Sequence, residues 1–132
     1  MSEEVFALVR VADEDLEEAE SALSRKKFRY ACYFAQQAVE KYLKAYLLFR
    51  KNEYPFVHSI AFLIRECSEF DKDFERLFEM GAHRLGKYYT MTRYMPLVEL
   101  SEENAREAIQ VAREVRDFVL KKLKLGERGT DE

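Results

Sequence analysis

The stretch ACYFAQQAVEKYLKAYLL, Ala31–Leu48, is apolar around most of a helix and leaves one narrow polar strip. At about 3.6 residues per turn, its apolar side chains recur every three or four positions, and its alanines form a second row that lets another helix approach closely. The strip holds Gln36, Gln37, Glu40, Lys41 and Lys44. This pattern predicts the central helix of a bundle, with a polar strip that opens onto a groove or a partner.

The rest of the chain also has helical patterns. We expect helices at about Glu3–Leu23, Lys27–Lys51, Ser59–Glu69, Asp71–Gly81, Leu85–Tyr94 and Ser101–Leu123. Ser101 and Asp71 are suited to cap the helices that follow them, and the four glycines and two prolines leave little room for a turn-rich β fold. Short loops between long amphipathic helices predict an all-α fold, an up-and-down bundle of four or five helices.

The length of 132 residues indicates one domain. We expect a single helical domain over residues 1–124 and a flexible C-terminal tail over residues 125–132. No apolar run reaches the roughly 18 residues that a membrane span requires, and the first ten residues carry two acids where a secretory signal has basic charge. We therefore expect a cytoplasmic protein, with Cys32 and Cys67 as buried thiols.

Basic residues concentrate in two windows of an acidic chain. Between Ser21 and Asn52, eight bases and one acid give a charge of +7 in a chain of net charge −3. These bases are Arg25, Lys26, Lys27, Arg29, Lys41, Lys44, Arg50 and Lys51. The second window, Met80–Val98, has no acid and interleaves Arg84, Lys87 and Arg93 with Tyr88, Tyr89 and Tyr94. Cations among aromatic rings suit phosphate neutralisation and base stacking, so the windows would form an anion-binding surface if the bundle brings them together.

Both windows also have a structural interpretation. The cations at the start of the first window can remain in water or pair with the acids of the preceding helix, Glu14, Glu17, Glu18 and Glu20. The tyrosines of the second window can pack at the end of the bundle while their hydroxyls stay in water. These alternatives remain open from the sequence.

Motifs of common enzymes are missing. The sequence has no G-x-S-x-G elbow, no glycine-rich phosphate loop and no H-E-x-x-H. Helical carboxylate pairs lack the E-x-x-H companions of a di-metal bundle, and the two histidines have no Cys or acid at zinc-ligand spacing. We therefore expect neither a metal nor a cofactor.

Three segments occur in an order and spacing that resemble the HEPN family of small helical domains. They are AQQAVEKYLKAYLL at Ala35–Leu48, HSIAFL at His58–Leu63 and KYYTMTRYMP at Lys87–Pro96. The resemblance runs from about Val5 to Leu123 and implies a homodimer. Many HEPN proteins are metal-independent ribonucleases with an Arg, four to six residues and then a His. Arg93 resembles that arginine, but Val98, Glu99 and Leu100 occupy the window of the histidine.

The RYMP segment at Arg93–Pro96 resembles the branch of the family that accompanies minimal nucleotidyltransferases and lacks the nuclease pair. The resemblance therefore implies a module that binds a nucleotide or RNA phosphate and acts with a separately encoded minimal nucleotidyltransferase, as in a toxin–antitoxin pair. The residues expected to bind the nucleotide are Gln37, Lys41, Lys44, Lys87, Tyr88, Arg93 and Tyr94. The predicted helix Lys27–Lys51 also has more apolar surface than one small bundle must bury, which favours a dimer as well.

Two other functions remain open. The first is a ribonuclease toxin that uses Arg93 or Arg76 with His83, because Arg76 and His83 are separated by six residues, as the nuclease motif requires. The second is a structural adaptor whose charges never meet nucleic acid. Since the histidine is missing at the expected position, we assign no catalytic residue.

Overall fold

The protein is all-α in the computed structural model, which describes residues 1–124. Its α-helices are α1 (Glu3–Ser24), α2 (Phe28–Lys51), α3 (Ile60–Ser68), α4 (Arg76–Glu79), α5 (Lys87–Tyr94) and α6 (Glu102–Leu123). Two 3-10 helices, η1 (Lys72–Glu75) and η2 (Ala82–Gly86), flank α4. The prediction of an all-α bundle is confirmed, and the predicted tail, 125–132, lies outside the described residues. No helix within residues 1–124 is long and apolar enough to cross a membrane.

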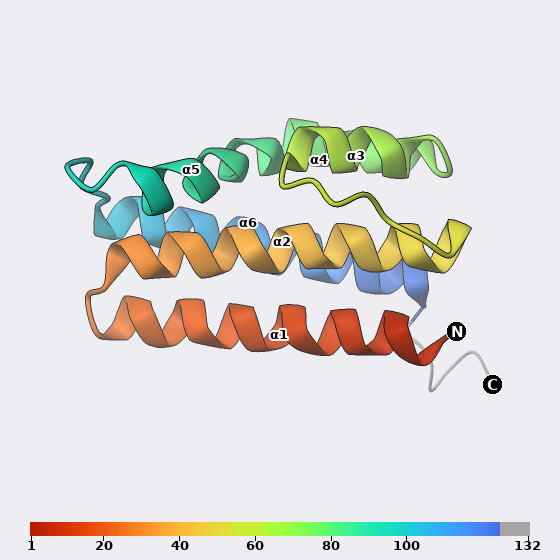
Figure 1. The fold of residues 1–132 in the computed structure, drawn as a ribbon, viewed down its shortest axis with the longest axis horizontal. Coiled ribbons are helices and arrows are strands. Elements are labelled where there is room, and N and C mark those ends of the chain that lie inside the picture. The colour runs from red at the N-terminus through yellow and green to blue at the C-terminus, as the bar shows by residue number, and fades with distance from the viewer. Residues whose placement is uncertain (125–132) are drawn as a thin grey trace.

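Helix α2 lies at the centre of the bundle (Figure 1). Helix α1 runs antiparallel to it along one side, and α6 packs behind it in the same direction as α2. The segment from α3 to α5 covers the side of α2 opposite α1, so the third leg of the up-and-down path is broken into short helices. This break leaves a groove between the starts of α3 and α5.

Most of the apolar surface of α2 is buried by its own chain. Ala31, Ala38 and Ala45 are fully buried, and their small side chains allow close helix packing. Tyr42 and Tyr46 are buried as well. Helices α1, α3, α5 and α6 all contact α2. Tyr30 and Phe49 remain exposed (57% and 41%), so part of the apolar surface of α2 stays uncovered.

The predicted helix ends are confirmed by their caps. The Ser101 hydroxyl accepts a hydrogen bond from the Asn104 amide (3.1 Å), and the Asn104 side chain accepts one from the Ser101 amide (2.9 Å). Asp71 accepts from the amide of Asp73 (2.9 Å) at the start of η1. Gly81 follows α4 with a φ of +79°, a conformation that glycine adopts without strain. Local side chains thus fix where the short helices begin and end.

One polar cluster joins the three long helices. Asp13 of α1 accepts hydrogen bonds from the Tyr42 hydroxyl of α2 (2.5 Å) and from Arg116 Nε of α6 (2.9 Å). Burial, together with the nearby Asp13 carboxylate, raises the pKa of Tyr42, so its hydroxyl stays protonated and donates. The cluster thereby fixes how the long helices are placed relative to one another.

Both cysteines are buried and free, as predicted. Burial raises the pKa of the Cys32 thiol to about 11, and it also raises the pKa of Cys67. Both thiols therefore stay protonated at neutral pH, which makes them poor nucleophiles.

Arg29, in the first turn of α2, holds the end of α5 and the loop after it. Its guanidinium donates to the carbonyl oxygens of Met91, Thr92, Met95, Pro96 and Val98. The carbonyls of Met91 and Met95 also accept backbone hydrogen bonds from the amides of Met95 and Val98. The guanidinium fork adds charged donors to these carbonyls and to the loop carbonyls beside them. The two basic windows meet at this contact.

We expect Arg29→Ala to lower the free energy of unfolding by about 2 kcal/mol, because it removes charged donors from carbonyls that lie 62 or more residues away in the sequence. Urea denaturation measures this loss. Arg25→Ala, at the exposed end of α1, is the matched control and should change stability by less than about 0.5 kcal/mol. Equal losses in both variants would show that the carbonyl contacts do not hold the segment.

Candidate functional site

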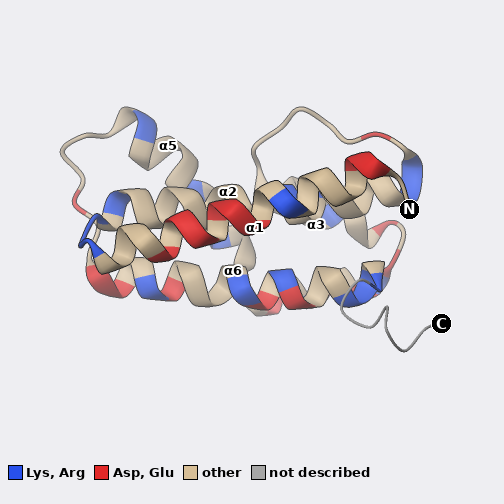
Figure 2. Cartoon of the chain, turned by 90° about the horizontal axis from the view of Figure 1, so that it is seen from below, with Lys and Arg blue, Asp and Glu red and all other residues tan. Residues whose placement is uncertain are grey.

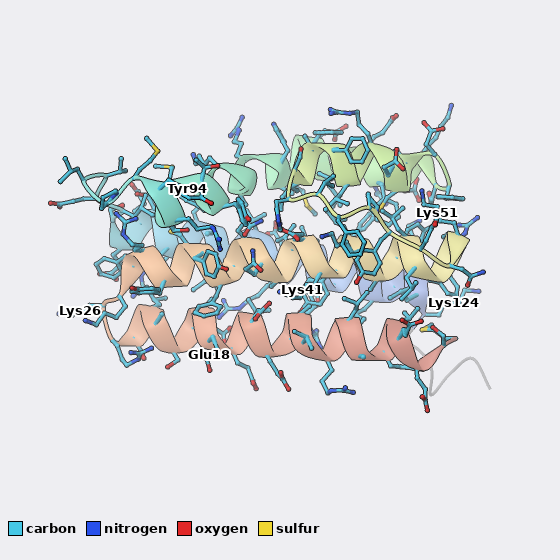
Figure 3. All side chains as sticks on the ribbon, in the orientation of Figure 1. Glu18, Lys26, Lys41, Lys51, Tyr94 and Lys124 are labelled. Atoms are coloured by element: carbon cyan, nitrogen blue, oxygen red, sulfur yellow. The ribbon has the colours of Figure 1, made fainter. Side chains whose placement is uncertain are left out.

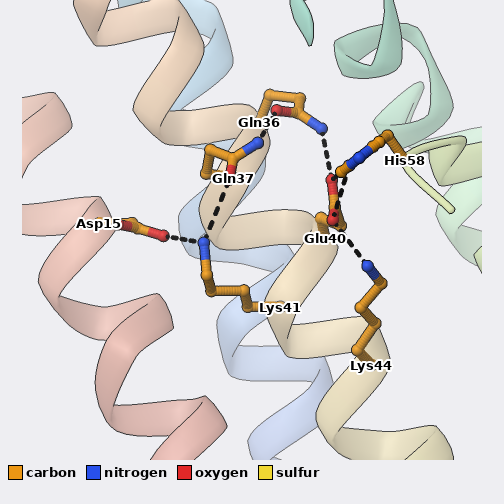
Figure 4. Close-up of polar contacts among 7 residues, drawn as sticks. All are labelled: Asp15, Gln36, Gln37, Glu40, Lys41, Lys44 and His58. Atoms are coloured by element: carbon orange, nitrogen blue, oxygen red, sulfur yellow. Dashed lines mark hydrogen bonds and ion pairs between the residues drawn. The ribbon is translucent and has the colours of Figure 1, made fainter. Parts of the chain in front are cut away.

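The polar strip of α2 converges on the carboxylate of Glu40 (Figure 4). Glu40 is 5% exposed and accepts hydrogen bonds from Gln36 Nε2 (3.0 Å) and Lys44 Nζ (2.8 Å). His58 Nδ1 lies 3.1 Å from Glu40 Oε2. Because a carboxylate oxygen accepts, we assign the donor of this contact to His58 Nδ1.

The strip continues from Glu40 toward α1. Gln37 donates to Gln36 Oε1 (2.7 Å), and Lys41 Nζ donates to Gln37 Oε1 (3.2 Å) and to Asp15 of α1 (2.7 Å). Burial raises the pKa of Asp15, and the pairing with Lys41 opposes this rise. The structure thus brings Gln37, Lys41 and Lys44 together on α2, with both ammonium groups engaged by carboxylates.

His58 connects this network to α5. Its ring stacks on Tyr89 with the ring centroids 4.0 Å apart and an angle of 14° between the planes. The Arg93 guanidinium lies 5.0 Å from the centroid of Tyr89 and 5.7 Å from that of Tyr94. In Figure 3, Lys41 lies between α1 and α2, whereas Tyr94 lies on α5, across α2 from α1. Glu40, His58 and Tyr89 therefore form a continuous path between the two basic windows.

The tyrosines of α5 differ sharply in exposure. Tyr88 is only 3% exposed and is buried beside Cys32, where burial raises the pKa of its hydroxyl. Tyr94 is 66% exposed and presents an open ring. Tyr89, which was not among the predicted binding residues, lies one helical turn before Arg93 and on the same side of α5. The four-residue spacing of Tyr89 and Arg93 could have identified Tyr89 as a binding residue from the sequence. Nothing in the sequence indicated that His58 stacks on Tyr89.

The basic side chains of the second window, Met80–Val98, are not neutralised by acidic partners in the part of the chain that the structure describes. Among residues 1–124, Arg84, Lys87 and Arg93 form no ion pair, in contrast to Lys41 and Lys44. Figure 2 shows this difference: acids mark α1 and alternate with bases along α6, but α5 carries no acid. The described residues also contain no pair between the α1 acids and the bases at the start of the first window. The α5 side is therefore the unpaired cationic side of the site.

Arg76 and His83 lie in different grooves. Arg76 lines a groove with Glu114 and Asp117, and its guanidinium packs 5.6 Å from the ring centroid of Phe118. His83 lines a groove between the starts of α3 and α5. The two side chains thus share no groove. Within residues 1–124, no three His, Cys, Asp or Glu side chains are placed to hold a metal ion.

We expect Glu40→Gln to lower the free energy of unfolding by about 3 kcal/mol, because it leaves the buried Lys44 ammonium without a counter-charge. Glu40→Gln combined with Lys44→Met should recover most of this loss. Guanidinium denaturation of the single and double variants measures both effects. If the double variant is no more stable than the single one, the pair does not control the burial of Lys44.

Comparisons with known proteins were consistent with this architecture. Residues 5–123 match the family model of the HEPN domain. The crystal structure of TT1696 from Thermus thermophilus is similar at 31% identity, with a TM-score of 0.80 over 92% of this chain and 99% of that chain. ST0689, an archaeal HEPN homologue, is 29% identical, with a TM-score of 0.65 over 89% of this chain and 96% of that chain. No curated protein matched the sequence. The chain belongs to the HEPN domain family.

Proposed function

We propose that this HEPN domain binds the phosphate of a nucleotide or RNA on its α5 side. The observation that carries the proposal is Arg93, an exposed cation that forms no ion pair within residues 1–124 and lies beside the rings of Tyr89 and Tyr94. Lys87, at the start of the same helix, adds a second unpaired cation. Neighbouring cations and an open aromatic ring are what single-stranded nucleic acid requires.

The predicted binding residues take different roles in this proposal. Arg93 and Lys87 neutralise phosphate, and the open ring of Tyr94 stacks on a base. Gln37, which is partly exposed, supplies an amide. Lys41 and Lys44 act through their carboxylate partners by holding the polar strip in place. Because Tyr88 is buried, we propose that Tyr89 contacts the nucleotide in place of Tyr88.

The predicted effect of Arg93 is electrostatic. We expect Arg93→Ala to weaken binding of a single-stranded RNA about tenfold at low salt and to reduce the slope of log affinity against log salt by about 0.7. Arg10→Ala on α1 removes the same charge from another exposed, unpaired arginine and should change affinity less than about twofold. Fluorescence anisotropy over a salt series measures both. Salt-independent binding, or equal losses in the two variants, would contradict the proposal.

The same proposal includes a separately encoded minimal nucleotidyltransferase as partner, in a cytoplasmic toxin–antitoxin-like pair, and a homodimer. Membership of the HEPN family and the resemblance of the RYMP segment support the pairing. The end of α5 supports a protein contact, because Met95 and Leu97 are exposed after Tyr94 while Arg29 binds the carbonyls of Met95 and Pro96. Apolar groups on a fixed loop are typical of interfaces.

We expect the chain to sediment at twice its monomer mass and Leu97→Glu to convert it to a monomer. Phe56→Glu is the matched control, because Phe56 is as exposed as Leu97 (93% and 94%) but lies in the loop before α3. Co-expression with the product of an adjacent nucleotidyltransferase gene tests the pairing by co-purification. A monomeric parent chain would contradict the dimer, and separate elution of the two proteins would contradict the pairing.

A further inference from the structure

Both histidines of the chain line one groove between the starts of α3 and α5. The groove has a volume of about 400 Å³. Its lining residues are His58, Ser59, Ile60, Ala61, His83, Gly86, Lys87, Tyr89 and Thr90. None of them is acidic, and Lys87 forms no ion pair within residues 1–124. The lining of the groove therefore combines a cation, two imidazoles and three hydroxyl side chains and includes no acid.

The surroundings of the imidazoles fix how they are placed in the groove. His58 is held by Glu40 through Nδ1, while about half of its side chain stays exposed. The His83 ring packs against Phe78, with centroids 5.1 Å apart, and its Nδ1 is buried without a hydrogen-bond partner in the described part of the chain. A proton on this buried nitrogen would have no acceptor, so the ring proton belongs on Nε2. Both imidazoles are thus held in fixed orientations, and His83 offers Nε2 as a donor.

The backbone adds donors to the same groove. Ile60 and Ala61 open α3, where the first amides of a helix have no partner within the helix. The Ser59 hydroxyl is engaged as the cap of Phe62 (3.1 Å), and Ile60 is only 1% exposed, so Ala61 is the more open of the two positions. A Cβ added to Gly86 would lie 3.7 Å from the Ile60 nitrogen, an ordinary van der Waals contact. Such a Cβ would fit and would occupy space in the groove that Gly86 lines.

We propose that this groove holds a phosphomonoester, the terminal phosphate of a nucleotide or RNA strand, an inference that rests on the proposed function of the α5 side. A terminal phosphate carries close to two negative charges and three acceptor oxygens, more than an internal phosphodiester. Lys87, His83 and the Thr90 hydroxyl offer it three kinds of donor. Tyr89 lines the groove and contacts Arg93, so a strand held at its end continues along α5.

The test compares one short RNA in three forms, with a 5′-phosphate, with a 3′-phosphate and with hydroxyls at both ends. The parent protein should bind one phosphorylated form about tenfold tighter than the hydroxyl form, and which one it prefers identifies the strand end. Gly86→Ala should bring the ratio of the two affinities, phosphorylated form to hydroxyl form, close to one and leave the affinity for the hydroxyl form unchanged. The backbone of Gly86 is helical (φ −56°, ψ −30°), so alanine fits without strain. His83→Ala, which removes the Nε2 donor, should act in the same way.

The two proposals fail in different ways. Arg93→Ala should weaken binding of all three RNA forms by the same factor and leave the ratio of phosphorylated to hydroxyl affinity unchanged. If the parent protein binds the phosphorylated and hydroxyl forms with equal affinity, the groove proposal is overturned and the proposed function still stands. If no RNA binds, the proposed function is wrong, and inorganic phosphate then tests the groove. Millimolar phosphate should shift the imidazole NMR signals of His58 and His83, the two histidines of the sequence, in the parent but not in Gly86→Ala. Unshifted signals would overturn the groove.

Discussion

The carboxylate of Glu40 is the constraint on which the arrangement of the candidate site depends. A buried carboxylate is costly unless its oxygens accept hydrogen bonds, and here Gln36, Lys44 and His58 supply them. His58 comes from the loop between α2 and α3, so the requirement of one α2 side chain fixes the position of that loop. The fixed imidazole in turn supports the ring of Tyr89 and, through it, Arg93. One charge in the core thereby orders a surface of the protein.

The cations of this HEPN domain are divided between two uses. Lys41 and Lys44 are engaged by carboxylates, and the Arg29 guanidinium binds backbone carbonyls, so none of the three is free for a ligand without breaking an internal contact. Lys87 and Arg93 have no such contact within residues 1–124. The proposed binding surface is therefore defined by Lys87 and Arg93, which lie beside aromatic rings without an acidic partner in the described residues, rather than by the total charge of a window.

Much of the fold was predictable, because periodicity and caps are local. The pattern of Ala31–Leu48 predicts a helix with neighbours on every side, and Ser101 and Asp71 mark helix starts. The site was less predictable. Tyr88 and Tyr89 are adjacent, yet one is buried and the other lies against His58. Neighbouring residues of a helix point about 100° apart, and the short sequence of α5 does not reveal which of the two faces the core. Likewise, the polar strip indicated a groove, whereas Lys44 is buried against a carboxylate of its own helix.

Photo-cross-linking of a bound single-stranded RNA, followed by mass spectrometry of the peptides, identifies the helix that contacts the strand. We expect cross-links within residues 87–97, at Tyr94 above all, because its ring is open beside Arg93. Cross-links confined to α1, which is mostly acidic, or to α6, where acids alternate with bases, would contradict binding on the α5 side.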